Sequence, residues 1–139
     1  MAYTEYASGV FTPTAVGQTT AGTQTYTKQV GQWTRIGNCV FIFIRVAWSA
    51  NSGTGNINIG TLPFLVQSVS FYFPSLSVIP GLSLATTLPS GNTQCLVEAN
   101  ENSNILVVNQ YNPTTGSSGN LQVGATGDFS ISGFYFTNA

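Results

Sequence analysis

CVFIFIRVAWS, residues 39–49, follows a turn at Gly37-Asn38 and predicts a long β-strand. Successive side chains of a strand point to opposite faces, and here both faces are apolar. One face carries Val40, Ile42, Ile44, Val46 and Trp48, and the other carries Cys39, Phe41, Phe43 and Ala47. One face of an antiparallel sheet is commonly in water, so a strand with two apolar faces needs cover on both. We therefore expect one face to fill the core of the domain and the other to fill an interface between subunits.

Arg45 interrupts the second of these apolar faces. A charge in that position needs a partner, and Glu98 or Glu101 could supply one, from the same chain or from a neighbouring subunit. The alternative is that Arg45 lies near the end of the strand and extends its charged group to solvent.

The rest of the chain predicts an all-β fold. Gly, Thr, Ser and Asn recur every few residues, and apolar patterns with a helical period are absent. Besides 39–49, the expected strands are residues 56–60, 65–73, 75–86, 93–98, 104–111, 121–123 and 128–137, with loops at 88–92 and 112–120. Strands at this spacing favour an antiparallel, jelly-roll-like β-sandwich for residues 31–139.

The last expected strand, 128–137, changes its apolar phase. Phe129 and Ile131 alternate with serines, but Phe134 and Phe136 then stand on the serine face. Either Gly133 marks a bulge that re-aims the strand, or the strand passes from a solvated zone into a covered one. The residues that we assign to the subunit interface are Phe41, Phe43, Arg45, Phe134 and Phe136.

Residues 1–30 differ from the rest, because alternation is weak and threonine, proline and glycine break any long strand. We expect an extended N-terminal arm that contacts a partner protein. A first edge strand with a frayed end is the equal alternative. The apolar anchors of the arm are Tyr3, Tyr6, Val10 and Phe11.

Charge is scarce: three basic and four acidic residues, and no histidine, in 139 residues. An ordinary domain is about 25% charged; this one is 5% charged. Without histidine the common catalytic triads and zinc sites are excluded, and three basic residues cannot neutralise a nucleic-acid backbone. No apolar run has the roughly 20 residues that span a bilayer. We expect a structural or binding protein with no cofactor, metal, nucleic acid or membrane partner.

Three groups of residues are weaker candidates for a catalytic, metal or sugar-binding site. Glu98, Glu101 and Asp128 could form a glycosidase pair, although their spacing does not specify one. The Asn-rich turn at 98–104 is the single candidate for calcium, and a plain turn is favoured. Neutral loops at 88–92 and 112–120, with Trp48, Tyr72 and Tyr111, could bind a sugar, although tryptophan is favoured as a packing residue.

Cys39 and Cys95 lie far apart in the sequence, with no Cys-x-x-Cys pair. The first residues lack the basic and apolar regions of a secretory signal, so we expect synthesis in a cytoplasm. Buried free thiols are therefore favoured over a disulfide, which would need the two strands to be neighbours.

The stretch GQWTRIGNCVF at 31–41, followed by GTGNINI at 53–59 and TLPF at 61–64, resembles a module found in bacteriophage tail fibres, tailspikes and other virion appendages. The lead-in at 11–14 and 20–26 is also similar, and the resemblance covers about residues 8–75. It implies a β-sandwich that assembles as a trimer in the virion. The position of Gly60 before Thr61 and Leu62 departs from the pattern and leaves that turn open.

Two functions fit the resemblance. The first is a trimeric capsid decoration, or cement, protein on the capsid exterior, whose arm contacts the major capsid protein; the module appears here without a shaft. The second is a receptor-binding tip of a tail or head fibre that recognises a host-surface polysaccharide through the neutral loops. In both, the chain is made in the host cytoplasm, is not an enzyme, and works in the virion.

Overall fold

The structure is a computed structural model and describes residues 5–70, 72, 74–80 and 94–138. It is all-β, and its strand pairings are antiparallel. The strands are β1 (Tyr6–Phe11), β2 (Thr14–Gly17), β3 (Gln24–Ile36), β4 (Cys39–Asn51), β5 (Ile57–Gly60), β6 (Ser75–Pro80), β7 (Gln94–Ala99), β8 (Leu106–Tyr111), β9 (Ser118–Asn120) and β10 (Gly127–Phe136).

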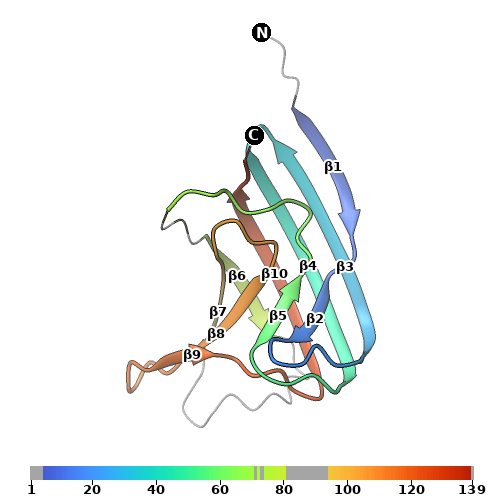
Figure 1. Cartoon of the computed structure of the whole chain (residues 1–139), viewed down its shortest axis with the longest axis vertical. Coiled ribbons are helices and arrows are strands. Elements are labelled where there is room, and N and C mark those ends of the chain that lie inside the picture. Colours follow the sequence, from blue (N-terminus) through green and yellow to red (C-terminus); the bar gives the residue numbers. More distant parts are fainter. Residues whose placement is uncertain (1–4, 71, 73, 81–93, 139) are drawn as a thin grey trace.

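One curled sheet contains all of these strands. Its order is β1-β3-β4-β10-β6-β7-β8-β5-β2, and β9 pairs with β8 off this path. The sheet bends into a half-barrel, so that β5, β7 and β8 lie across the core from β4 and β10 (Figure 1). We call β1, β3, β4 and β10 the long-strand half of the sheet, because β3, β4 and β10 are its longest strands.

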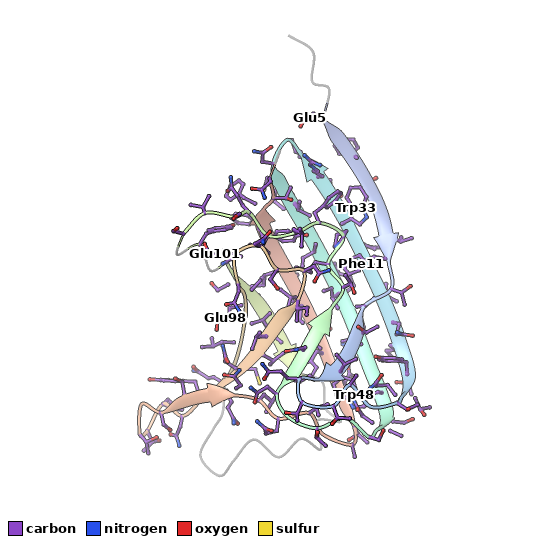
Figure 2. The ribbon with its side chains drawn as sticks, in the orientation of Figure 1. Glu5, Phe11, Trp33, Trp48, Glu98 and Glu101 are labelled. Atoms are coloured by element: carbon purple, nitrogen blue, oxygen red, sulfur yellow. The ribbon has the colours of Figure 1, made fainter. Side chains whose placement is uncertain are left out.

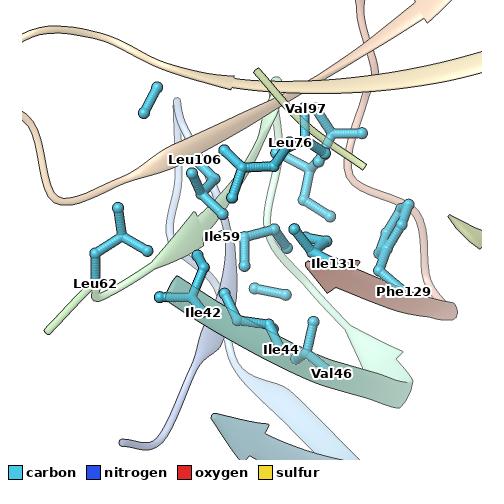
Figure 3. Close-up of a cluster of buried hydrophobic side chains, with 14 of the residues drawn as sticks. Ile42, Ile44, Val46, Ile59, Leu62, Leu76, Val97, Leu106, Phe129 and Ile131 are labelled. Atoms are coloured by element: carbon cyan, nitrogen blue, oxygen red, sulfur yellow. The ribbon is translucent and has the colours of Figure 1, made fainter. Parts of the chain in front are cut away.

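The core lies inside the curl. Val40, Ile42, Ile44, Val46 and Trp48 of β4 are at most 5% exposed, which confirms that one face of the 39–49 strand fills the core. Figure 3 shows β4 side chains packed against those of β5, β7, β8 and β10. Burial of this kind stabilises the fold by about 25 cal/mol for each Å² of apolar surface removed from water.

A two-residue turn joins the two longest strands. Ile36 pairs with Cys39 across Gly37-Asn38, and Gly37 has a positive φ of 58°. Glycine adopts this conformation without steric cost, and it suits the first central position of a hairpin turn. The turn expected at Gly37-Asn38 is confirmed, and it sets the register between β3 and β4.

Residues 65–70, expected to begin a strand, form none; of the rest of the expected 65–73 strand, 71 and 73 lie outside the described residues. Their backbone is bonded elsewhere: Val66 accepts from the Asn102 N–H at 3.0 Å and donates to the Ser103 carbonyl at 2.8 Å. Pro63 and Pro74 flank the segment and cannot donate to a ladder. Among the described residues the segment makes a single bridge, Val66 to Thr137, and Gln67 donates to the Phe136 carbonyl at 2.7 Å. Alternation alone was therefore misleading here, because the segment pairs at one point and not along a ladder.

Other expected strands appear with altered limits. Residues 56–60, 93–98, 104–111 and 128–137 correspond to β5, β7, β8 and β10, and 75–80 of the expected 75–86 forms β6. Residues 121–123 form no named strand and make a single bridge, Asn56 to Gln122. The loop expected at 112–120 contains β9, which pairs with β8.

The N-terminal segment is part of the sheet. Residues 6–11 pair with β3 as the edge strand β1, and 14–17 pair with β5 as β2. The edge-strand alternative therefore describes residues 6–11, rather than an extended arm. The strand β3 runs without interruption across the boundary expected between residues 30 and 31.

The phase change in β10 needs no bulge against β4. Its register is continuous from Gly127 opposite Trp48 to Phe136 opposite Cys39. Gly133 has a φ of 152°, and a Cβ there would approach the Leu76 side chain at 3.2 Å. Glycine at this position lets Leu76 pack against the inner side of β10, while the outer side changes from serine to phenylalanine.

Candidate functional site

The outward side of the long-strand half gathers apolar residues from all four of its strands. Residues paired across antiparallel strands have side chains on the same face. Phe41 of β4 pairs with Thr34 on one side and Phe134 on the other, and Phe43 pairs with Gln32 and Ser132. We call the following set the outer face: Tyr6, Val10, Val30, Ile36, Phe41, Phe43, Phe134 and Phe136.

Each of these side chains is exposed in the single chain. Phe43 is 42% exposed, Phe134 51% and Val10 80%. Of the eleven large hydrophobic side chains that are exposed in the described part of the chain, eight belong to the outer face. Contiguous exposed apolar surface of this kind marks interaction sites on soluble proteins. The four phenylalanines that we assigned to an interface from the sequence are therefore together and uncovered.

Three of the four phenylalanines form a connected row of rings. The ring centroids of Phe41 and Phe134 are 5.9 Å apart, and those of Phe134 and Phe136 are 6.0 Å apart. Tyr72 extends the row, with its centroid 6.2 Å from that of Phe136. The Tyr72 hydroxyl also accepts a hydrogen bond from the Phe136 N–H at 2.9 Å. Aromatic pairs at these separations contribute about 0.5–1.5 kcal/mol beyond the burial of their area.

A shallow hollow of about 210 Å³ lies beside this row. It is lined by Gln32 and Thr34 of β3 and by Phe41 and Phe43 of β4, with the backbones between them. This volume is smaller than the roughly 300 Å³ at which pockets for drug-sized ligands begin. The hollow suits one side chain of a partner protein.

The outer face ends at an ion pair. Arg45 Nη2 lies 2.7 Å from Asp128 Oδ2, and Arg45 Nη1 donates to the Ser130 hydroxyl at 2.6 Å. The partner expected from the sequence, Glu98 or Glu101, is wrong. The reason is the register of β10 on β4, which sets Ser130 directly opposite Arg45 and Asp128 two residues along the same face.

Asp128 was not predicted from the sequence as the partner of Arg45. Its side chain is 10% exposed, and its second oxygen, Oδ1, is buried without a hydrogen-bond partner among the described residues. Asp128 is an even number of positions from Phe134 and Phe136, and this spacing would have placed it on the same face of the strand. Val30 and Ile36 were also missed, because β3 had not been given a strand pattern of its own.

The residues expected in the arm are divided between two faces. Tyr6 and Val10 lie on the outer face, whereas Phe11 is half-buried against the core, with its ring over Gly31 of β3. Figure 2 shows Phe11 and Trp33 on the inner side of the long-strand half. Tyr3 lies outside the described residues. Of the expected arm contacts, Tyr6 and Val10 therefore join the expected subunit contacts on the outer face, and Phe11 does not.

The candidate catalytic carboxylates do not converge on Asp128. Glu98 accepts a hydrogen bond from the Asn109 side chain at 2.8 Å, and Glu98 and Glu101 lie on the side of the molecule away from β1 and β3 (Figure 2). Asp128 lies on the opposite, outer side of β10. Among the described residues, no three His, Cys, Asp or Glu side chains cluster as a metal site would require.

The candidate sugar-binding aromatics are placed differently from one another. Trp48 is 2% exposed and donates its indole N–H to the Gly124 carbonyl at 2.9 Å, so it is a core residue. Tyr72 is engaged with Phe136, and Tyr111 is half-buried at the end of β8. The loop 88–92 lies outside the described residues. No helix in the described part of the chain is long and apolar enough to cross a membrane.

Both cysteines are free thiols and half-buried. Cys39 begins β4 next to Phe136, and Cys95 lies on β7 in the other half of the sheet. Burial raises the pKa of both thiols. The preference for free thiols is confirmed for the single chain, and each group stays protonated to a higher pH than a free cysteine would.

No protein-family model and no curated protein sequence matches this chain. Among solved structures, the fold is similar to that of the crystal structure of the Dettilon tailspike protein, with a TM-score of 0.69 and 23% sequence identity. The similarity covers 96% of this chain and 24% of the tailspike chain. This chain thus spans about a quarter of the length of that protein. At this identity, the similarity establishes the fold.

Proposed function

We propose that this chain is a structural component of a bacteriophage virion that assembles as a homotrimer through its outer face. The observation that carries the proposal is the concentration of eight of the eleven exposed large hydrophobics of the described chain on that single face. The tailspike fold supports a place in a virion. We further propose that the curled sheet is a jelly-roll-like sandwich, in which the long-strand half is one layer and the remaining strands are the other.

The size of the outer face suits a subunit contact. Four strands spaced about 4.8 Å apart and about ten residues long give a face on the order of 600 Å². Stable protein interfaces bury about 800 Å² on each partner, and the largest apolar patch of an ordinary monomer covers about 300–600 Å². The outer face is therefore at the upper end of what a monomer leaves uncovered and close to what an assembly needs.

A second copy of this chain is the partner that fits the charge of the face. Two of its charged groups, Arg45 and Asp128, are paired with each other, and the third, Lys28, lies beside them at the same end of the face, where it pairs with Ala47. The apolar part of the face therefore needs no countercharge, and a strongly charged partner there would lose solvation without gaining an ion pair. The chain itself, with a net charge of −1 and 5% charged residues, meets this condition. Arg45 thus completes the face by neutralising Asp128.

Within the virion, we retain capsid decoration as the proposed role, with the major capsid protein as partner and the capsid exterior as location. Cement proteins act by burying surface across subunit joints, and a neutral, aromatic-rich trimer suits that task. The tailspike similarity favours a place on the tail instead. In either place the chain is proposed to be non-enzymatic, because the carboxylates Glu98 and Asp128 lie on opposite sides of the molecule.

The alternative is a receptor-binding tip that recognises a host-surface polysaccharide. One observation favours it: the β8–β9 hairpin projects from the body of the molecule (Figure 1). Its turn is uncharged, exposed at 113–120, and ordered by Asn112, whose side-chain oxygen accepts the N–H groups of Thr114 and Thr115 at 2.9 and 3.1 Å. A preformed neutral loop of this kind can offer hydroxyl and amide groups to a sugar.

The assembly is tested by native mass spectrometry of Phe43→Asp beside wild type. We expect three chains, or a multiple of three, for wild type, and loss of the threefold contact for Phe43→Asp, because a carboxylate would be buried in an apolar interface. Leu96→Asp is the matched control, since Leu96 is 52% exposed but lies on β7, away from the outer face. A wild type without threefold assembly, or equal effects of the two variants, would overturn the trimer.

The location is tested by the copy number of the chain per virion, measured by quantitative mass spectrometry against the major shell protein. A number comparable to that of the shell protein supports capsid decoration. A small fraction of it supports the tail or a single vertex, and would overturn the decoration role. Binding of host polysaccharide to the isolated trimer, lost on shortening the loop 113–117, would then support the receptor-binding alternative.

A further inference from the structure

Strand β1 leaves one side of its backbone open. Gly37 donates its N–H to the Glu5 carbonyl at 2.9 Å, so Glu5 and Gly37 form a hydrogen-bonded pair at the end of the β1–β3 ladder. Bonded pairs alternate along an antiparallel ladder. The N–H and C=O groups of Tyr6, Ser8 and Val10 therefore point away from β3. Within the described part of the chain, no hydrogen bond reaches these outward groups.

The strand at the other end of the sheet is closed. The open side of β2 is bonded by side chains from β3 and β4: the Tyr26 hydroxyl accepts the Ala15 N–H at 2.8 Å, and the Asn51 amide donates to the Ala15 carbonyl at 3.2 Å. The Gln29 amide covers the Pro13 carbonyl in the same way, at 2.9 Å. The fold therefore protects one of its two edges and leaves the other one bare.

The bare edge also lacks the features with which proteins block strand addition. Such features are charged side chains, proline and bulges. The sequence of β1, YASGVF, contains no charged residue and no proline, and its register with β3 is regular. Tyr6 and Val10 are 69% and 80% exposed. An edge of this composition is a template for another strand.

We propose that β1 pairs with β1 of a second copy of this chain, antiparallel and centred on Ser8. In this register Ser8 faces Ser8 of the second copy, and Tyr6 faces Val10 of the second copy. Each outward N–H then meets an outward C=O of the partner, and none of these groups is left unpaired. The exposed Tyr6 and Val10 side chains cover each other as a cross-strand pair, which is a favourable combination of aromatic and β-branched residues.

The alternative registers are poorer. A shift by one residue would set the outward backbone groups against the inward ones and place exposed side chains opposite Ala7 and Gly9, on the wrong face. A shift by two residues would leave some outward groups without a partner. All of these registers have the twofold symmetry of a contact between identical surfaces, and the one centred on Ser8 is the one in which backbone bonding and side-chain cover agree.

This contact is separate from the proposed trimer. It bonds the backbone of the sheet edge, whereas the trimer buries the side chains of the outer face, of which Tyr6 and Val10 belong to both contacts, and it does not depend on the location of the chain in the virion. Twofold and threefold contacts together produce assemblies of six chains in the simplest closed case. Each contact can therefore be removed without the other.

Ser8→Pro tests the edge contact directly. The Ser8 N–H points outward, so proline removes a donor from the open edge and none from the β1–β3 ladder. Ser8→Ala, which keeps the N–H, is the matched control. Native mass spectrometry is expected to show six chains for wild type and Ser8→Ala, and three for Ser8→Pro. Phe43→Asp is expected to leave a dimer, and the double variant a monomer.

The outcomes separate the two proposals. A trimeric wild type whose mass Ser8→Pro does not change overturns the edge contact and leaves the trimer intact. A dimeric wild type that Ser8→Pro dissociates supports the edge contact and overturns the trimer. If Ser8→Pro unfolds, as judged by circular dichroism, Val10→Lys in the Phe43→Asp background replaces it, because the trimer contact, to which Val10 also belongs, is then already absent, and a lysine on an edge strand opposes strand addition. A folded double variant that remains a dimer likewise overturns the proposal.

Discussion

Arg45 on β4 and Asp128 on β10 form an ion pair of 2.7 Å across two neighbouring strands, at the polar end of a sheet face that carries four exposed phenylalanines. The carboxylate is nearly buried, whereas the guanidinium side chain keeps 30% of its exposure. The pair therefore neutralises Asp128 where the outer face would otherwise carry an uncompensated charge.

Removing Arg45 alone is expected to destabilise the fold. Arg45→Met leaves the buried Asp128 carboxylate without its cation, which costs about 2 kcal/mol of unfolding free energy. The double variant Arg45→Met/Asp128→Leu is expected to recover most of that loss, because an apolar pair of similar size replaces a buried ion pair at little cost. Urea unfolding of the single and double variants completes the cycle. Additive single effects would show that the two groups do not interact.

Gly127 is expected to tolerate no side chain. It pairs with Trp48 across β10 and β4, and a Cβ at this position would overlap the buried indole ring. Gly127→Ala should lower the unfolding free energy by about 1–3 kcal/mol, the usual cost of overpacking a core. Gly119→Ala is the matched control, because nothing lies within 4 Å of its added Cβ. Equal melting temperatures for the two variants would contradict this packing.

Tyr135 is expected to make stability fall at alkaline pH. Burial raises the pKa of its hydroxyl, and that hydroxyl donates to the Phe64 carbonyl at 2.9 Å. The unfolded tyrosine ionises near pH 10, while the folded one stays neutral, so the unfolded state binds fewer protons. The unfolding free energy should therefore fall as pH rises above about 10.

Tyr135→Phe checks this assignment. It should remove part of the alkaline fall and cost about 1 kcal/mol at neutral pH through the lost hydrogen bond. Chemical unfolding between pH 8 and pH 11 measures both effects. A wild-type stability that is flat across this range would contradict the expectation, as would a variant with the same slope as wild type.

The two thiols are expected to be alkylated slowly. No prior reduction should be needed, because neither thiol is in a disulfide. Both are free, and burial raises both pKa values, so less thiolate is present at neutral pH than for a free cysteine. Alkylation with iodoacetamide should modify both and accelerate as pH rises. Cys39 lies beside the outer face, so its alkylation should be faster in Phe43→Asp than in wild type. Cys95 on β7 is the internal control and should react equally in both proteins.

Much of this surface could be predicted from local pattern. The two apolar parities of 39–49 predicted a buried and an outward face, and the buried one is confirmed. Phe134 and Phe136 were predicted beside Phe41 and Phe43, and the register of β10 on β4 puts them there. Alternation is a local property of a strand, so it can be recognised in the sequence without knowledge of the fold.

The parts that failed depend on which strands become neighbours. Arg45 was expected to meet Glu98 or Glu101, but its partner Asp128 is 83 residues away and is chosen by strand order. Alternation in 65–73 predicted a strand, but the backbone of Val66 is bonded to Asn102 and Ser103, and the described part of the segment pairs with the end of β10 only at the bridge from Val66 to Thr137. At the N-terminus an extended arm and an edge strand were equal alternatives, and the pairing of residues 6–11 with β3 decides for the edge strand.

Residue order and composition are enough to show an all-β chain with a core strand at 39–49, few charges and an apolar surplus on the outward side of that strand. The folded chain is needed to show that residues from β1, β3, β4 and β10 share one outer face, that Asp128 neutralises Arg45, and that β1 rather than β2 keeps an open edge. Strand character follows from local side-chain alternation, whereas shared faces, ion pairs and edges follow from hydrogen-bonded register between segments that are distant in the chain.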